Sequence, residues 1–304
     1  MSEREQDNKV EGEKILYSQN FLKDPELVNR LLEKTSINSK DIVYEIGPGK
    51  GVITKELGKR SKKVIAFEKD ERLYSYLMEQ FKDSNDIKIH LGDFLKQDID
   101  FKNTKVFSNI PFNITADIIK KLVNIENSPS DTYLFLQKEA SEKYSGTPKE
   151  TLVSLLIKPW FELRELHDFS PEDFSPKPSV DVVLLQIQKR GEFLIKERDS
   201  QLYKDFISYS FSQWQPNIGK IFKKIFTYKQ LKKLSKDLNF GLENKITDLT
   251  FEQFLNTFYY FLQGVDFKKQ REVFDSGKKL QKQQKNLKKI HRSRTDKSWK
   301  RKKR

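Results

Sequence analysis

The chain contains no cysteine and only three histidines in 304 residues. The lack of cysteine excludes disulfide bonds, a catalytic thiolate and zinc sites built on cysteine. The three histidines, His90, His167 and His291, are far apart in the sequence, which argues against a histidine-rich metal site. We therefore expect no metal site.

The sequence also lacks an apolar run of about 18 residues, the length that a membrane-spanning helix requires. Residues 1–14 mix charges of both signs and contain no apolar stretch, so they do not resemble a signal peptide and are expected to be disordered. Charged residues make up 34% of the chain and hydrophobic residues 36%. We expect a soluble, cytoplasmic protein without membrane contacts. Because no large apolar surface pattern stands out, we also expect a monomer.

The net charge of +14 is concentrated near the C-terminus. Residues 265–304 hold 17 Lys and Arg against 4 Asp and Glu, whereas residues 1–264 hold 41 against 40. A basic tail of this kind suggests a polyanionic partner such as nucleic acid. A tail that only improves solubility is the alternative interpretation.

Short apolar runs alternate with amphipathic segments over residues 15–190, the first predicted domain. A helix is expected to begin after Asp24, which can cap it, with Pro25 in its first turn. Strands that alternate with helices predict a mostly parallel sheet covered on both faces. The predicted strands are residues 42–46, 64–67, 87–91, 105–108, 133–136 and 180–187, and the predicted helices between them include residues 52–59, 73–81 and 116–123.

The sequence pattern changes after about Arg190. Amphipathic segments separated by turn residues predict a small helical domain over residues 191–264. Beyond it, residues 265–304 have too few apolar residues to fold alone, and we expect a disordered basic tail. The helices predicted for the second domain are residues 202–211, 220–226, 228–238 and 251–262.

A glycine-rich turn directly follows the first predicted strand. Glycine lets the backbone turn tightly and approach a ligand closely, and open α/β sheets bind nucleotides at the carboxyl ends of their strands. Gly51 follows Gly49 by two positions rather than three, which argues against a dinucleotide fingerprint. An ordinary tight turn remains an alternative for the turn alone, which reads Glu45-Ile46-Gly47-Pro48-Gly49-Lys50-Gly51.

Acidic residues follow at the ends of the next two predicted strands. Glu68 lies 21 residues after Gly47, where a carboxylate can accept hydrogen bonds from a ribose diol. Asp93 can accept a hydrogen bond from an adenine amine, and Phe94 can pack on the adenine ring. Each carboxylate alone also fits a solvated strand-end or turn residue. Their order at consecutive strand ends favours an adenosine-containing cofactor.

The fourth predicted strand is followed by Asn109-Ile110-Pro111-Phe112, which resembles the (Asp/Asn/Ser)-Pro-Pro-(Tyr/Phe) signature of enzymes that methylate exocyclic base amines. The amine of adenine is a poor nucleophile because its lone pair is delocalised into the ring. The side-chain oxygen of Asn109 and the backbone oxygen of Ile110 can accept its hydrogen bonds and localise that lone pair. Pro111 would stiffen the loop, and Phe112 would stack on a flipped base. A proline turn with a buried phenylalanine is the alternative.

In this order, the motifs resemble those of the ribosomal RNA adenine N6-dimethyltransferases, and within them the erythromycin-resistance (Erm) methyltransferases. The resemblance covers residues 15–262 and includes the segments 18–22 (Ser-Gln-Asn-Phe-Leu) and 174–181 (Phe-Ser-Pro-Lys-Pro-Ser-Val-Asp). It implies a Rossmann-like α/β methyltransferase domain, a helical domain that recognises rRNA, and S-adenosylmethionine as cofactor.

The resemblance also implies a role for each matched residue. Asn109, Ile110 and Phe112 would carry catalysis, and Phe112 and Phe174 would stack on the flipped base. Phe112 departs from the tyrosine of most family members, which removes a hydroxyl and keeps the ring. The residues implied at the cofactor are Gln19, Asn20 and Leu22 over it, Gly47 and Gly49 at its methionine part, Glu68 at its ribose, Asp93 and Phe94 at its adenine, and Asn109 beside both substrates.

Two branches of this family differ in their target. Erm enzymes modify one adenine of 23S rRNA, which blocks macrolide, lincosamide and streptogramin B antibiotics, and the housekeeping branch dimethylates two adjacent adenines of 16S rRNA. The loop 109–112 and the segment 214–218 (Trp-Gln-Pro-Asn-Ile) are nearer the Erm pattern, and the arginine-rich segment usual in the housekeeping enzymes is absent. Against this, residues 137–139 (Gln-Lys-Glu) resemble the housekeeping branch. The sequence favours a 23S rRNA methyltransferase.

Two other classes stay open at this point. Some relatives of this fold act as nucleic-acid-binding factors, a role that the complete 109–112 loop, Glu68 and Asp93 argue against. A methyltransferase with a small-molecule substrate is disfavoured by the basic tail and by the base-stacking loop.

Overall fold

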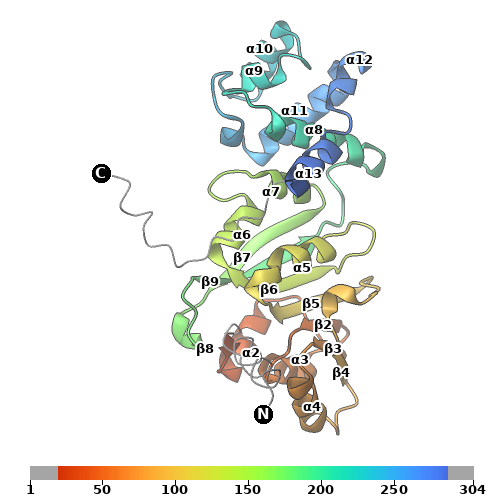
Figure 1. Cartoon of the computed structure of the whole chain (residues 1–304), viewed down its shortest axis with the longest axis vertical. Helices are drawn as coiled ribbons and strands as arrows, with labels where there is room; N and C mark the ends of the chain where they lie inside the picture. Colours follow the sequence, from red (N-terminus) through yellow and green to blue (C-terminus); the bar gives the residue numbers. More distant parts are fainter. Residues whose placement is uncertain (1–19, 287–304) are drawn as a thin grey trace, which may run out of the picture. The chain divides into compact units, whose positions relative to one another are not determined.

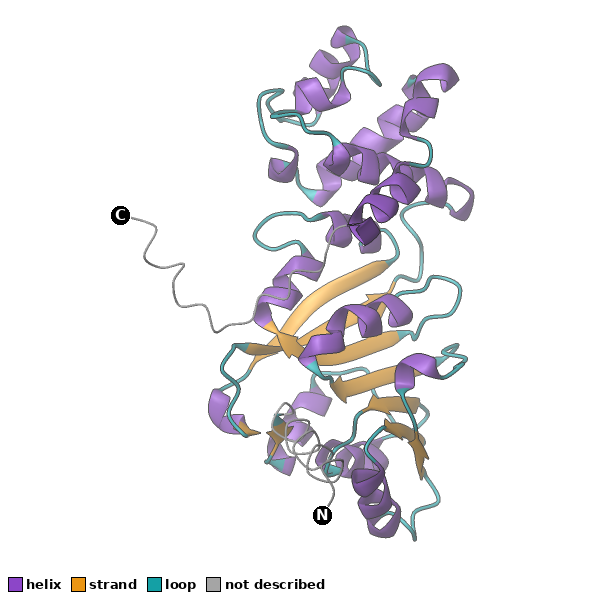
Figure 2. Cartoon of the chain, in the orientation of Figure 1, coloured by secondary structure: helices purple, strands orange, loops and turns teal. Residues whose placement is uncertain are grey.

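The computed structural model describes residues 20–286 and divides into two compact units, residues 1–196 and 197–304. The first unit is an α/β domain and the second is helical (Figures 1 and 2). This confirms the predicted fold class. Within residues 20–286, no helix is long and apolar enough to cross a membrane.

The first unit contains a seven-stranded sheet in the order β4-β3-β2-β5-β6-β9-β7. Strands β4 to β6 are parallel, and β9 runs antiparallel to both β6 and β7. A separate two-stranded sheet pairs β1 with β8. The strands are β1 (Phe21–Leu22), β2 (Ile42–Ile46), β3 (Lys63–Glu68), β4 (Ile87–Leu91), β5 (Thr104–Asn109), β6 (Asp131–Gln137), β7 (Phe161–Asp168), β8 (Phe174–Ser175) and β9 (Val182–Lys189).

The order of the strands reverses between β2 and β5. The chain builds outward from β2 to β3 and β4, and then returns to place β5 and β6 on the other side of β2. Open α/β sheets bind ligands at such a switch point, outside the carboxyl ends of the strands. The glycine-rich turn after β2 and the loop after β5 therefore lie side by side.

The helices of the first unit include α2, which begins as the sequence predicts. The Asp24 side chain accepts a hydrogen bond from the backbone N–H of Glu26, and Pro25 occupies the first turn. This satisfies one of the N–H groups that a helix start leaves without a partner. The helices are α2 (Pro25–Glu33), α3 (Val52–Arg60), α4 (Glu71–Gln80), α5 (Thr115–Leu122), α6 (Lys138–Ser145) and α7 (Leu152–Ile157), with short 3₁₀ turns η1 (Phe94–Lys96), η2 (Phe112–Ile114) and η3 (Pro171–Asp173).

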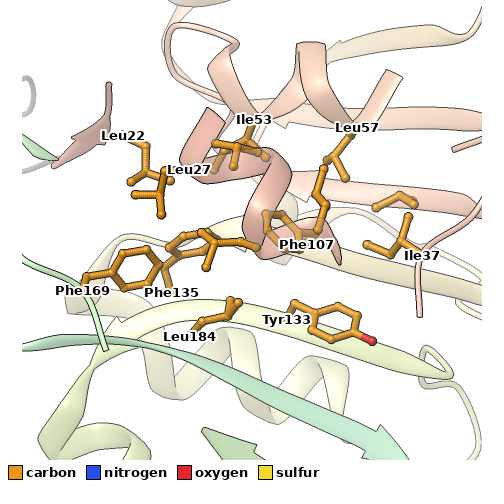
Figure 3. Close-up of a cluster of buried hydrophobic side chains, with 14 of the residues drawn as sticks. Leu22, Leu27, Ile37, Ile53, Leu57, Phe107, Tyr133, Phe135, Phe169 and Leu184 are labelled. Carbon is orange, nitrogen blue, oxygen red and sulfur yellow. The ribbon is translucent and has the colours of Figure 1, made fainter. Parts of the chain in front are cut away.

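One face of the sheet packs against α2 and α3 in a single hydrophobic cluster (Figure 3). Strand residues point alternately to the two faces, so Val43 joins this cluster while Tyr44 faces the other side. There, Tyr44 lies 5.6 Å from Phe101 between ring centroids. The cluster in Figure 3 includes Leu22, Leu27, Ile37, Ile53, Leu57, Phe107, Tyr133, Phe135, Phe169 and Leu184.

The second unit consists of helices, as predicted, but its boundary lies later than expected. The chain divides between Lys196 and Glu197 rather than at residue 190. The reason is that Ile195 is buried and Leu194 donates a backbone hydrogen bond to Pro159. The elements are η4 (Glu197–Asp199), α8 (Ser200–Ser212), α9 (Ile218–Phe222), α10 (Tyr228–Asp237), η5 (Ile246–Asp248), α11 (Phe251–Gly264), α12 (Phe267–Gln270), η6 (Arg271–Val273) and α13 (Ser276–Asn286).

The expectation that the whole of residues 265–304 is a disordered tail is wrong for residues 265–286. These residues form α12, η6 and α13, and α13 packs on α8. Val273 is fully buried, and Asp205 of α8 accepts backbone hydrogen bonds from Asp275 and Gly277 at 3.2 and 2.8 Å. A side chain about 70 positions away in the sequence thus caps the start of α13. The tail beyond it, residues 287–304, and the N-terminal residues 1–14 lie outside the described residues.

Candidate active site

The carboxyl ends of β2 and β5 separate at the switch point. Direct pairing between these strands ends at Tyr44 and Val106. Beyond it, the Ser108 hydroxyl joins the strands: it donates to the Ile46 backbone oxygen at 2.6 Å and accepts from the Ile46 backbone N–H at 3.1 Å. The strands are thereby held apart by one side chain, which leaves room for a pocket. Ser108 could not be identified from the sequence, because a serine in a strand carries no distinctive signal.

A pocket lies at this position and encloses about 530 Å³ of empty space, part of it open to solvent. It joins three parts of the chain that are distant in sequence: the β1 region, the turn after β2 and the loop after β5. Its lining residues are Asn20, Phe21, Leu22, Gly47, Pro48, Lys50, Val52, Ile53, Asn109, Ile110, Pro111 and Phe112. Of the proposed site residues, Asn20, Leu22, Gly47, Asn109, Ile110 and Phe112 are thus brought together.

The turn after β2 places its backbone close to other groups. Gly49 has φ +59°, a conformation that favours glycine, and a Cβ atom there would lie 2.4 Å from the Phe21 ring. Gly47 has φ +67° and no heavy atom within 4 Å of its Cβ position. Gly49 therefore supports the Phe21 ring, whereas Gly47 leaves space open at the pocket wall. Phe21 and Lys50 also line the pocket, although neither was predicted from the sequence as a site residue. The Lys50 ammonium lies 6.0 Å from the Phe21 ring centroid.

Hydrogen bonds fix the motifs at neighbouring strand ends to one another. The Gly47 backbone donates to Phe67 at 2.9 Å, and the Gly92 backbone donates to Glu68 at 2.8 Å. The glycine turn, Glu68 and the turn with Asp93 therefore follow one another along the edge of the sheet. However, Gly49, Glu68, Asp93 and Phe94 are not part of the pocket lining.

Glu68 is a buried carboxylate at the end of β3 with most of its acceptor capacity in use. Its Oε1 accepts from the backbone N–H groups of Lys69 and Asp70 at 2.8 and 2.9 Å, and its Oε2 accepts from Gly49 at 3.2 Å. A carboxylate has about four lone-pair sites, so one on Oε2 remains for a ribose hydroxyl. Burial raises the pKa of Glu68.

Glu45 is a second buried carboxylate, one residue before the end of β2. Thr54 of α3 donates its hydroxyl hydrogen to Oε2 of Glu45 at 2.6 Å. Burial and the nearby charge of Glu68 raise the pKa of Glu45 to about 8, and the bond from Thr54 opposes the rise. Glu45 was only part of the glycine motif in the sequence, and its pairing with α3 appears only in the fold.

Asp93 and Phe94 form the turn after β4. Oδ1 of Asp93 accepts from the Leu95 backbone at 3.0 Å and caps η1, and Oδ2 lies 3.7 Å from the Lys69 ammonium. The Phe94 ring is buried and packs against Phe67 and Phe101, with ring centroids 5.9 and 6.1 Å away. Asp93 thus keeps acceptor capacity, whereas the Phe94 ring is covered by protein in this conformation.

Asn109 ends β5, and its side-chain amide is fixed from the opposite wall of the pocket. Its Nδ2 donates to the backbone oxygen of Asn20 at 2.6 Å. Within residues 20–286, no hydrogen-bond donor reaches the Asn109 Oδ1 or the Ile110 backbone oxygen. Two free acceptors therefore flank the pocket, in the arrangement expected for holding an exocyclic amine. Gln19, expected beside Asn20, lies outside the described residues.

The two phenylalanines expected to stack on a base lie in different surroundings. Phe112 is half-buried and lines the pocket. Phe174 is 0% exposed; it pairs with Leu22 across the β1–β8 ladder, and its ring centroid lies 5.3 Å from that of Phe169. Phe174 is therefore a core residue that supports β1, and the expectation that it stacks on a base is wrong for this conformation. Its position in the motif had suggested function, but the strand pairing buries it.

Metal ligands do not gather in the described part of the chain. Within residues 20–286, no group of three or more His, Asp or Glu side chains is placed to hold a metal ion. The polar groups near the pocket are instead paired with backbone amides and hydroxyls, as described for Glu45, Glu68 and Asp93.

The sequence is similar to two groups of characterised rRNA methyltransferases. It is 30% identical over 254 residues to the rRNA adenine N-6-methyltransferase of Escherichia coli, a match that covers 82% of this chain and 96% of that protein. It is 34% identical over 209 residues to ribosomal RNA small subunit methyltransferase A of Listeria welshimeri, covering 64% of this chain and 70% of that protein. The two kinds of relative match at similar identity.

The fold is similar to that of two solved structures. The 23S rRNA methyltransferase ErmE has a TM-score of 0.75 at 23% identity, covering 80% of this chain and 100% of that chain. A dimethyladenosine transferase from Plasmodium falciparum has a TM-score of 0.66 at 22% identity, covering 81% and 99%. The family model for ribosomal RNA adenine dimethylases matches residues 11–263. The chain therefore belongs to the ribosomal RNA adenine dimethylase family.

Proposed function

We propose that this protein, an S-adenosylmethionine-dependent rRNA adenine dimethylase by family, methylates the N6 amine of a single adenine in 23S rRNA. The modification would confer resistance to macrolide, lincosamide and streptogramin B antibiotics. The observation that carries the reaction is a pair of acceptors beside the pocket, Asn109 Oδ1 and the Ile110 backbone oxygen, which no donor among residues 20–286 reaches.

The residues around the pocket fit the cofactor. Asn20, Leu22 and Gly47 line the pocket, and Gly47 keeps one wall clear of side-chain atoms. Glu68 retains one acceptor position for the ribose, and Asp93 retains Oδ2 for the adenine amine. When bound, S-adenosylmethionine supplies an electrophilic methyl group. A carboxylate that is already oriented by three backbone N–H groups loses little freedom on binding, which favours affinity.

The Asn109–Phe112 loop prepares the amine for attack. Two acceptors that bind the two amine hydrogens hold the nitrogen lone pair out of conjugation with the ring. The Asn20 carbonyl fixes the Asn109 amide through Nδ2, so that Oδ1 is the atom left to face the amine. Groups held in place before binding are the main source of such electrostatic assistance. The nitrogen would become positively charged when it takes the methyl group, and in this state it is acidic enough to lose its excess proton to solvent, so no histidine is required.

Phe112 is proposed to hold the target base. Its ring is half-buried on the hydrophobic cluster and borders the pocket. Enzymes that act on a base flip it out of the helix and stack it against aromatic side chains. The core packing of Phe112 fixes the ring, and the tyrosine hydroxyl that most family members carry at this position is not needed for stacking.

The helical unit is proposed to contact the RNA backbone. Residues 214–236 contain no acidic residue, and the Trp214 side chain is 99% exposed. Exposed lysines and aromatic side chains together suit phosphate contacts and stacking on unpaired bases. The exposed lysines of this segment are Lys220, Lys223, Lys224, Lys229, Lys232, Lys233 and Lys236.

The choice of 23S rather than 16S rRNA is supported by sequence features outside the common core of the family. The Asn109–Phe112 loop and the segment 214–218 follow the Erm pattern, and the arginine-rich segment of the housekeeping enzymes is absent. Residues 137–139 follow the housekeeping pattern and line a surface hollow with Asp181. The housekeeping 16S rRNA dimethyltransferase is therefore the second candidate.

Methyl transfer from labelled S-adenosylmethionine to unmodified 23S and 16S rRNA, as transcripts and as subunits, tests the proposal. We expect label at one adenine of 23S rRNA, none with Asn109→Ala, and normal label with Asn113→Ala, a matched control at an exposed position of the adjacent turn. Label in 16S rRNA alone would assign the housekeeping function. No label in either RNA, with cofactor still bound, would refute both targets.

A further inference from the structure

A lysine ammonium is enclosed by backbone carbonyls next to the proposed adenine site. Lys121 lies near the end of α5, and its Nζ donates to the backbone oxygens of Phe94 at 2.8 Å and Leu95 at 3.3 Å, and also to that of Gln97. The same ammonium lies 4.9 Å from the centroid of the Phe94 ring. A lysine has three N–H donors, so the three carbonyls match its capacity.

These contacts fix the C-terminal side of a turn that is too short to be stable alone. The 3₁₀ turn η1 has three residues, Phe94–Lys96, and Asp93 caps its N-terminal side through the Leu95 N–H. The Phe94 carbonyl also accepts the Gln97 backbone N–H at 3.2 Å within the turn, whereas the Leu95 and Gln97 carbonyls at its end lack partners within the turn. Asp93 and Lys121 therefore hold the turn from its two ends.

Lys121 also connects this turn to the loop that carries the chemistry. Helix α5 begins at Thr115, directly after η2, which itself begins at Phe112. Residues 93–97 and 109–112 are thus joined through one rigid helix and one side chain. Burial lowers the pKa of Lys121, while the nearby Asp98 and Asp93 oppose this, so the ammonium sits in partly desolvated surroundings. Lys120, its neighbour in the helix, is exposed.

We propose that Lys121 is a positioning residue for S-adenosylmethionine. By binding the carbonyls of Phe94, Leu95 and Gln97, it holds the turn that presents Asp93 to the adenine and keeps that turn in register with the Asn109–Phe112 loop. The proposal rests on the placement of the adenine at Asp93 in the proposed function, and it holds for either rRNA target.

The expected consequence is a defect in cofactor binding more than in methyl transfer itself. An apolar side chain at position 121 leaves the Leu95 and Gln97 carbonyls without a donor and removes one of the two donors to the Phe94 carbonyl, so the turn is held less firmly. Because small displacements of a binding group have large effects, we expect the Kd of S-adenosylhomocysteine to rise about tenfold in Lys121→Met. KM for S-adenosylmethionine should rise by a similar factor, and kcat should fall less.

Calorimetric titration of the full chain with S-adenosylhomocysteine tests the inference. Lys120→Met is the matched control, because it removes the same charge one position away, and it should bind like the wild type. Lys121→Arg should recover part of the affinity, since a guanidinium can still donate to two of the carbonyls. A Kd for Lys121→Met within twofold of that of Lys120→Met overturns the proposal. If Lys121→Met does not fold, the Kd of Lys121→Gln is compared with that of Lys120→Gln, and the same twofold limit applies.

A parallel titration of Asp93→Ala separates this inference from the placement of the adenine. Weakened binding by both Asp93→Ala and Lys121→Met supports the proposal. Weakened binding by Asp93→Ala alone overturns the role of Lys121 and leaves the adenine site in place. Normal binding by Asp93→Ala removes the adenine from this turn, and the proposal for Lys121 fails with it.

Discussion

Replacing Glu45 by glutamine should remove a large part of the pH dependence of folding stability. The Glu45 carboxyl is 1% exposed, and its pKa is raised to about 8, first by burial and then by the charge of Glu68. Among residues 20–286, its hydrogen-bond partner is the Thr54 hydroxyl, which donates to Oε2. Glutamine has nearly the same shape, and its Oε1 can accept the same hydrogen bond, so the substitution removes the charge and preserves the contact.

The sign of the pH dependence follows from the pKa of Glu45 in the unfolded and in the folded chain. In the unfolded chain Glu45 ionises near its ordinary pKa of 4.5, whereas in the folded chain it keeps its proton to about pH 8. The stability contributed by the protonated group is fully present below pH 4.5 and is lost as the pH rises through 8. A pKa difference of this size corresponds to about 4–5 kcal/mol as an upper bound, at about 1.4 kcal/mol for each pH unit. Burial raises the pKa of Glu68 as well. Stability should therefore still fall somewhat with rising pH in the Glu45→Gln variant.

Urea denaturation at a series of pH values between 5 and 9 measures this effect. The free energy of unfolding of Glu45→Gln should rise relative to that of the wild type by several kcal/mol between pH 5 and pH 9. Glu71→Gln is the control, because it removes a carboxylate that is exposed on α4. Its unfolding free energy should change with pH in parallel with that of the wild type. Parallel curves for Glu45→Gln and the wild type would show that Glu45 is ionised in the folded protein, and the reasoning would be refuted.

Two further predictions concern residues whose role the fold redefines. Phe174→Leu should cost about 1–3 kcal/mol in stability, because it replaces a fully buried ring by a smaller side chain, and it should methylate rRNA at close to the wild-type rate; a hundredfold loss of kcat in a stable variant would restore the base-stacking role. Asp205→Ala should lose about 1–3 kcal/mol because the backbone N–H groups of Asp275 and Gly277 lose their acceptor. Hydrogen exchange should then increase in α13 and stay unchanged in the first unit, and unchanged protection of α13 would contradict the capping role.

The sequence predicts those parts of the fold that depend on local periodicity. The parallel strands contain short apolar runs or, in β4, alternate apolar and polar residues, and α2 has its cap and proline in place, so each could be located without knowledge of the rest of the chain. The edge strand β7 was not predicted, because its pairing is interrupted by a bulge between Glu165 and His167, which breaks the alternation of apolar and polar residues. Helix α13 was not predicted for a different reason. It is rich in lysine and glutamine, and the residue that caps it, Asp205, is about 70 residues away in the sequence.

The candidate site, too, could be predicted only in part. Motif order at consecutive strand ends was enough to place Glu68, Asp93 and Asn109 at one edge of the sheet, because parallel strands end on the same side. It could not show which side chains face the pocket, since that depends on pairings between distant segments. The β1–β8 ladder is the clearest case. It buries Phe174 beneath β1 and holds this segment beside Asn20, whose carbonyl orients Asn109.

This arrangement offers a reason why a core residue, Phe174, and a proposed catalytic residue, Asn109, belong to one set of motifs. Asn109 can present Oδ1 to an amine only while Nδ2 is held, and the carbonyl that holds it belongs to the residue directly before β1. The position of β1 depends in turn on its pairing with Phe174 and Ser175. We therefore expect a change in the 174–181 segment to affect the reaction only where it displaces the backbone of β8 and, through the β1–β8 pairing, that of β1.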